Sequence, residues 1–128
     1  MNVVLDTSVF IAREAGRPLL DLPADASTAV SVMTIAELRI GVLVAAGSAA
    51  RDLRLRTLES ATRDHEPLAV DAAVAENFAR LVALLREAGR NPRVIDTLIA
   101  ATALAHDASV ATQDAGFDGL PGVSVLHV

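Results

Sequence analysis

Short apolar runs alternate with segments of helical periodicity along this chain of 128 residues. Runs of four or five apolar residues are typical of strands buried on both faces in a parallel sheet. We expect five strands, at residues 2–5, 28–32, 67–70, 108–112 and 123–126. Helical spacing and end signals predict helices directly after Asp6 and over residues 34–46, 49–64, 71–89 and 92–106. This alternation predicts an α/β sandwich, in which helices cover both faces of a parallel sheet.

Composition narrows the class of protein. The length suits one domain, residues 1–128, and the 52% hydrophobic content excludes disorder. Cysteine is absent, which excludes a disulfide scaffold, and lysine is absent, which excludes any mechanism that needs a catalytic or phosphate-binding lysine. The net charge of −5 argues against a protein that coats nucleic acid by electrostatics alone.

Membrane and export signals are also missing from the pattern. The longest apolar stretch, residues 35–50, is interrupted by Glu37 and Arg39, so it is too short for a membrane span. The first ten residues carry no basic region, and their apolar run meets Asp6 too early for a signal peptide. We therefore expect a cytoplasmic protein without a membrane partner.

Four acidic residues come directly after predicted strands or near the starts of predicted helices. Asp6 comes directly after the first strand, and Glu37 lies one turn into the helix after the second. Asp96 is in the first turn of the helix that begins at Pro92, and Asp114 follows the fourth strand. Ligands of open parallel sheets bind beyond the carboxyl ends of the strands, where helix N-termini also point. The four carboxylates are thus candidates for one shared site.

Each acid taken singly has a structural explanation. Asp6 would cap a helix, and Glu37 would complete a capping box with Thr34. Asp96 would favour the positive end of its helix, and Asp114 would be a turn residue. Taken together, the four share one edge of the sheet, and all are acids although serine, asparagine and threonine cap helices equally well.

Carboxylates held a few ångströms apart repel one another unless positive charge compensates them. A divalent cation would supply that charge, and oxygen ligands without cysteine favour Mg²⁺ or Mn²⁺ over zinc. The histidines are poor ligand candidates: His65 precedes a loop, His106 is expected to cap the end of its helix, and His127 is next to the C-terminus.

Four segments carry a resemblance to a known family: Val3–Ser8, Thr34–Leu38, Asp96–Ala103 and Ala111–Asp114. They occur in the order seen in PIN-domain ribonucleases, and the chain more narrowly resembles the VapC-type toxins of bacterial type II toxin–antitoxin pairs. The resemblance covers essentially the whole chain. It implies a PIN-like α/β/α sandwich with a five-stranded parallel sheet in the order 3-2-1-4-5.

The resemblance also implies the site. The metal-binding and catalytic acids would be Asp6, Glu37, Asp96 and Asp114. Thr7 or Ser8 would orient Asp6 from behind, and Thr112 would do the same near Asp114.

One position departs from the family pattern. A second acid often stands two residues after the aspartate that matches Asp114, but that position here is Gly116, and Asp118 lies two residues further on. Two questions therefore stay open at this point: whether Asp114 or Asp118 is the fourth acid, and whether one metal ion binds or two.

The implied reaction is Mg²⁺-dependent endonucleolytic hydrolysis of RNA, with Mn²⁺ able to substitute. The ion would activate a water for in-line attack and neutralise transition-state charge, so no side chain need act as nucleophile. Arg13, Arg17, Arg39 and Arg93 lie near the acidic edge and would help to hold RNA, Arg93 first among them. With three Phe and no Tyr or Trp, little aromatic surface is left for base stacking.

The implied partners are proteins as well as RNA. VapC-type toxins form homodimers, and a cognate VapB-type antitoxin neutralises them in heterotetramers or larger complexes. The mean hydropathy of +0.44 is high for a small monomer and suggests hydrophobic surface for such partners. The helices at 33–46, 49–64 and 71–89 are the candidate surfaces.

Three alternatives remain. A receiver-type signalling module would place a phospho-acceptor at Asp71, but it needs a lysine that this chain lacks. A haloacid-dehalogenase-type phosphatase needs an aspartate where Ser8 stands. The third alternative is a catalytically inactive PIN-like binding protein whose acids only cap helices.

Overall fold

The computed structural model describes residues 1–128 and contains one four-stranded sheet, in the order β2-β1-β3-β4. The strands are β1 (Asn2–Leu5), β2 (Ser27–Ala29), β3 (Ser109–Thr112) and β4 (Val125–His127). All three strand pairs are parallel. The expected α/β class with a parallel sheet is therefore confirmed, and β1 and β3, which end next to acidic residues, lie side by side in its centre.

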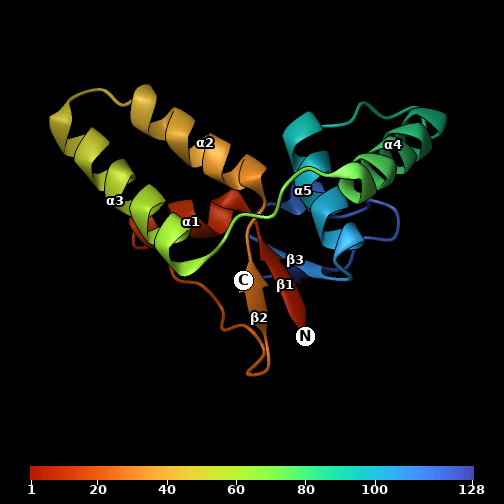
Figure 1. Ribbon diagram of the computed structural model, residues 1–128, viewed down its shortest axis with the longest axis horizontal. Coiled ribbons are helices and arrows are strands. Elements are labelled where there is room, and N and C mark those ends of the chain that lie inside the picture. The colour runs from red at the N-terminus through yellow and green to blue at the C-terminus, as the bar shows by residue number, and fades with distance from the viewer.

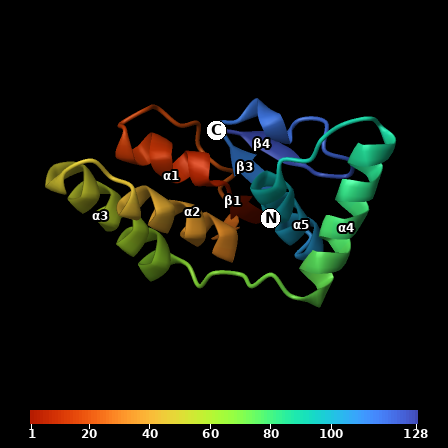
Figure 2. The ribbon, with the colours of Figure 1, turned by 90° about the horizontal axis from the view of Figure 1, so that it is seen from above.

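Five helices cover the sheet: α1 (Thr7–Glu14), α2 (Val32–Leu43), α3 (Ser48–Asp64), α4 (Ala72–Glu87) and α5 (Val94–Ala105). A 3-10 turn, η1 (Ala115–Phe117), follows β3. Helices α1, α2 and α3 lie on one side of the sheet, and α4 and α5 lie on the other (Figures 1 and 2). None of these helices combines the length and the apolar character that a bilayer crossing requires.

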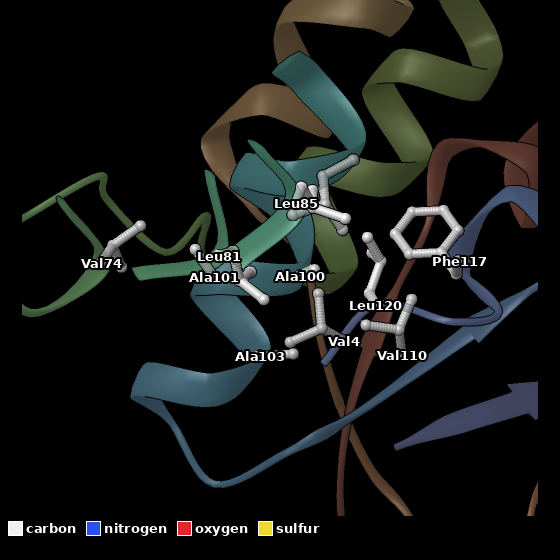
Figure 3. Packing of buried hydrophobic residues seen from close by; sticks show 11 residues of the cluster. Val4, Val74, Leu81, Leu85, Ala100, Ala101, Ala103, Val110, Phe117 and Leu120 are labelled. Atoms are coloured by element: carbon white, nitrogen blue, oxygen red, sulfur yellow. The ribbon is translucent and has the colours of Figure 1, made fainter. Parts of the chain in front are cut away.

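Strand β1 is buried on both faces, which explains its unbroken run of apolar residues. Val3 and Leu5 belong to the core cluster under α1, α2 and α3. Val4 belongs to the opposite cluster, where it meets Val110 of β3 and side chains of α4 and α5 (Figure 3). Since alternate residues of a strand point to opposite faces, a slip of one residue would exchange the two cores. The register of β1 is therefore fixed, and so is the position of Asp6 at its end.

The prediction of a strand at residues 67–70 is wrong. Only Leu68 pairs, through an isolated parallel bridge to Ser31 just after β2. Its N–H donates to Val30 O (2.8 Å), and its carbonyl accepts from Val32 N (2.9 Å). Pro67 has no N–H to donate, and Val70 is exposed beside the residue that caps α4. The segment lies beyond β2, where the expected order placed it, but the sheet has four strands rather than five.

Helix α2 begins earlier than expected. Its N-cap is Ser31, whose Oγ accepts from Met33 N at 3.1 Å, so Thr34 lies inside the first turn. The expected capping box between Thr34 and Glu37 is therefore wrong. The Glu37 carboxylate does not serve the start of its own helix and is available to other partners.

Candidate active site

Asp6 is placed by the end of β1 and the start of α1 together. Its N–H donates to Ala111 O at 2.9 Å, which extends the pairing with β3 by one bond. Its side chain is 4% exposed, and Oδ2 accepts from Ser8 N (3.3 Å) and from Thr112 Oγ1 (2.9 Å). Asp6 therefore caps α1, as the sequence allowed, but it also faces the end of the neighbouring strand.

The Thr112 hydroxyl joins two of the acids. It donates to Asp6 Oδ2 and accepts from the N–H of Asp114 at 2.8 Å. Ser8 Oγ lies 3.1 Å from it and accepts from Gln113 N at 3.0 Å. Since the threonine gives its proton to Asp6, Ser8 is the donor of the bond between the two hydroxyls. The segments at the ends of β1 and β3 are thus joined through the hydroxyl groups of Ser8 and Thr112.

Glu37 reaches the same region from the second turn of α2. Its Oε1 accepts from Thr7 Oγ1 at 2.5 Å. The hydroxyl of Thr34, fully buried, lies 3.5 Å from that of Thr7. Thr7 therefore contacts Glu37 rather than Asp6, the residue that the sequence reasoning gave it.

Asp96 shows that the four acids share one electrostatic environment. Burial raises its pKa to about 6, and the charges of Asp6, Asp114 and Glu37 add to the rise. Arg93 acts in the opposite direction and lowers this pKa. The Oδ2 atom of Asp96 is buried and accepts no hydrogen bond, although Arg93 Nε lies 3.0 Å from it in an ion pair. An unsatisfied, buried carboxylate oxygen is costly unless a further partner serves it.

Asp114 is held from two sides. Its Oδ1 accepts from Gly116 N at 2.8 Å, and its Oδ2 accepts from Arg93 Nη2 at 3.1 Å. These bonds, the one from Gly116 first, lower the pKa of Asp114, while Asp114 and Asp96 raise the pKa of Arg93. Asp118 instead pairs with His127 (2.7 Å) and is exposed. Of the two candidates for the fourth acid, the structure brings Asp114 to the other three.

The remaining side chains named from the sequence lie elsewhere. Arg13 packs over the Phe10 ring, 5.7 Å from its centroid, and the side chains of Arg17 and Arg39 are exposed. Asp71, the phospho-acceptor of the receiver alternative, caps α4 by accepting from Val74 N at 3.0 Å. The histidines contact other partners: Thr28 for His65, the end of α5 for His106 and Asp118 for His127.

One residue beside the acids was missed. Arg54 of α3 lines a hollow of about 230 Å³ together with Thr7, Glu37 and Glu14, and its Nη1 donates to Gly41 O at 2.7 Å. Several arginines of α3 occur at helical spacing with acids, and nothing in the sequence distinguishes Arg54 from the others. Only the packing of α3 against α2 brings it to this hollow.

The donor set suits a hard divalent cation. It consists of carboxylate oxygens near the N-terminal ends of α1 and α5, and one of these oxygens has no hydrogen-bond donor. No three acidic or histidine side chains converge closely enough to hold an ion as they stand. The contacts explain this: Thr7 holds Glu37, and Arg93 holds both Asp96 and Asp114.

Comparison with known proteins identifies the family. Residues 3–123, which include all four acids, match the PIN domain family. Ribonuclease VapC5 of Mycobacterium tuberculosis is 46% identical over 125 residues, which cover 98% of this chain and 92% of the relative. Ribonuclease VapC4 of the same organism is 45% identical over 131 residues, which cover both chains completely.

Solved structures give the same result for the fold. A chain of the VapBC-5 crystal structure from Mycobacterium tuberculosis matches with a TM-score of 0.82 at 45% identity, and the match covers 99% of this chain and 98% of that one. The FitAcB structure from Neisseria gonorrhoeae matches with a TM-score of 0.78 at 28% identity, over 98% and 96% of the two chains.

Proposed function

Because the chain belongs to the PIN-domain family and is similar to VapC ribonucleases, we propose that it is a Mg²⁺-dependent endoribonuclease and the toxin of a toxin–antitoxin pair. One observation carries the proposal. Asp6, Glu37 and Asp114, from three separate segments, act electrostatically on the half-buried Asp96, whose buried Oδ2 atom has no hydrogen-bond donor. Helix capping alone does not require four acids to share one place.

We propose that these four acids hold the ion, with Mn²⁺ able to replace Mg²⁺. When bound, the ion would supply positive charge at the phosphodiester and an activated water for in-line hydrolysis. The chain's own residues position the acids: Thr112 and the Ser8 amide hold Asp6, and Thr7 holds Glu37. Without cysteine or lysine, the chain has no side-chain nucleophile of those types to compete with water.

The Arg93 guanidinium would contact the RNA backbone. Its Nε and Nη2 atoms contact Asp96 and Asp114, and its side chain is 62% exposed. Guanidinium groups bind phosphate oxygens through paired N–H donors, so the free donors of Arg93 suit the phosphates that flank the scissile bond.

The proposed protein partners are a second copy of the chain and a cognate antitoxin, all within the cytoplasm. Support comes from three apolar residues at the end of α2, Ile40, Leu43 and Val44, which are 52–70% exposed. A group of exposed apolar side chains indicates an interaction surface, whereas a single one needs no explanation. The similar VapBC-5 structure from Mycobacterium tuberculosis, 45% identical to this chain, is a member of the VapBC family of toxin–antitoxin systems. A homodimer that joins its antitoxin in a heterotetramer would cover this surface.

Cleavage of RNA by the purified chain tests the proposed activity. The parent is incubated with mixed RNA in Mg²⁺, Mn²⁺ or EDTA, beside Asp6→Asn and Asp96→Asn. We expect cutting only with either ion, and a loss of about a hundredfold or more in each variant, because outer contacts of a metal site alone are worth 10–100-fold. Asp71→Asn, which alters a cap outside the site, is the matched control and should cut like the parent.

Two outcomes would contradict the proposal. If both site variants cut as fast as the parent, the acids do not form the active site. If the parent cuts no RNA with either ion while its circular dichroism shows a folded protein, the inactive PIN-like binding protein is the better description.

A further inference from the structure

Arg93 places one fixed cation between two acids of the site. It is the N-cap residue of α5, and its side chain makes no capping bond. Instead, Nε lies 3.0 Å from Asp96 Oδ2 and Nη2 lies 3.1 Å from Asp114 Oδ2. One planar group thus bridges carboxylates that are 18 positions apart in sequence, one on a helix and one after a strand.

Gly116 provides the space for this guanidinium. A Cβ built on Gly116 would clash with Arg93 Nη1 and lie 3.2 Å from its Cζ. The φ angle of Gly116 is not in the left-handed region, unlike those of five other glycines of the chain, so the backbone itself does not require glycine here. The property that Gly116 contributes is the missing side chain. The same residue also donates its N–H to Asp114 Oδ1 and fixes that carboxylate beneath the guanidinium.

We infer that Arg93, seated on Gly116, takes the place of a second metal ion, so that the site binds a single divalent cation. The inference rests on the proposed metal-dependent function. One divalent ion and one guanidinium bring three positive charges to the four carboxylates, which leaves the site nearly neutral. A second ion would need the oxygens of Asp96 and Asp114 that Arg93 already contacts, in competition with a cation tethered to the chain.

Position 116 therefore controls the number of ions in the site. A carboxylate there would add a ligand and, at the same time, remove the space that Arg93 occupies. Glycine adds no ligand, and it leaves the space that Arg93 occupies. In setting the number of ions, Arg93 and Gly116 do not bind an ion themselves; they act through the geometry of Asp96 and Asp114.

The number of Mn²⁺ ions bound per chain tests the inference, measured by calorimetric titration and by the loss of the free-Mn²⁺ electron paramagnetic resonance signal. The parent is expected to bind one ion. Arg93→Gln removes the tethered cation and is expected to bind two. Gly116→Ala keeps the arginine but displaces it, because the clash falls on the end of a flexible side chain, and it is also expected to bind two.

Matched controls separate this effect from charge and from glycine loss in general. Arg90→Gln removes the same charge three residues earlier, where Arg90 Nη1 contacts only the Gly119 carbonyl (2.8 Å). Gly41→Ala adds a Cβ at a glycine that also lacks a left-handed φ, at an ordinary 3.8 Å from Arg54 Cδ. Both should still bind one ion.

The inference is overturned if the parent binds two ions, or if Arg93→Gln and Gly116→Ala both still bind one. Failure of the proposed function looks different in the same samples. A parent that cuts RNA with two ions bound contradicts only the inference about Arg93. If the parent binds one ion and both variants bind two, but the parent cuts no RNA, the ribonuclease proposal is contradicted and the ion count stands.

Discussion

At the scale of the single residue, burial and three like charges destabilise the charged form of Asp96, and Arg93 stabilises it. The balance raises its pKa to about 6. An unfolded aspartate titrates near 3.9. The folded chain therefore holds this proton more tightly than the unfolded chain does. The contribution to stability is complete below about pH 4, is lost as the pH rises through 6, and is absent at neutral pH.

Asp96→Asn should therefore stabilise the protein without metal at pH 7.5. The pKa difference, reduced for solvent screening, corresponds to about 1 kcal/mol, which raises Tm by about 3–5 °C. At pH 4 the parent and the variant should melt together, since the carboxyl group is then protonated. Thermal melts in EDTA at the two pH values measure this, with the exposed Asp52→Asn as control. A variant that melts below the parent at pH 7.5 would contradict the account of Asp96.

Thr112 tests how far the acids depend on the groups behind them. Thr112→Val keeps the shape but leaves the Asp114 N–H without its acceptor and Asp6 Oδ2 without its closest donor. We expect a loss of about 1–3 kcal/mol in the free energy of unfolding and a loss of about tenfold or more in RNA cleavage. Urea unfolding and cleavage rates measure the two effects.

The control for Thr112 is Thr102→Val. Thr102 is equally buried, but its hydroxyl donates only to Leu98 O within α5. It should lose stability without a comparable loss of cleavage. Equal losses of cleavage in both variants would show that the effect of Thr112 is only structural.

At the scale of the element, α2 carries Glu37 and is held at its start by Ser31. Ser31→Ala removes the cap and should cost about 1 kcal/mol of stability, and fraying of the first turn should weaken Mn²⁺ binding as well. Asp71→Ala removes the cap of α4, which carries none of the four acids, and should cost similar stability with unchanged ion affinity. Urea unfolding and Mn²⁺ titration compare the two, and equal ion affinities would contradict a link between this cap and Glu37.

Elements with a strong period were predictable from the sequence, whereas single pairing partners were not. The apolar runs of β1 and β3 require burial on both faces, so the class of sheet followed from them, whereas the strand order came from the family resemblance. Residues 67–70 are also mostly apolar but reach only one bridge, because pairing depends on Pro67 and on where α4 begins. Composition does not contain that information.

The proximity of Asp6 and Asp114 was predictable for the same reason, since both follow parallel strands that end at one edge of the sheet. The partners of the four acids were not. The contact of Thr7 with Glu37 depends on how α1 packs against α2, and the position of Arg93 depends on the space that Gly116 leaves by having no side chain. In the sequence, Gly116 appears only as a departure from a family pattern, and its role is visible in the structure alone.

At the scale of the whole molecule, metal binding should appear as global stability, because the acids join β1, α2, α5 and the end of β3. At a Mg²⁺ concentration of about 100 times Kd, the gain is about 2.7 kcal/mol, or a Tm rise of roughly 10 °C. Removal of the ion by EDTA should reverse the rise. Asp96→Asn should show a much smaller one, and a parent that responds equally to NaCl of the same ionic strength would contradict specific binding.

The central place of β1, between β2 and the late strand β3, has a consequence for synthesis on the ribosome. The first strand emerges early, but the residue that orients Asp6 is Thr112, 106 positions later. A growing polypeptide therefore holds only scattered carboxylates until almost the entire chain has been translated, and a truncated product that stops before β3 lacks residues of the proposed ion site. Under the proposed function, we expect the producing cell to meet a working nuclease only once translation is nearly complete.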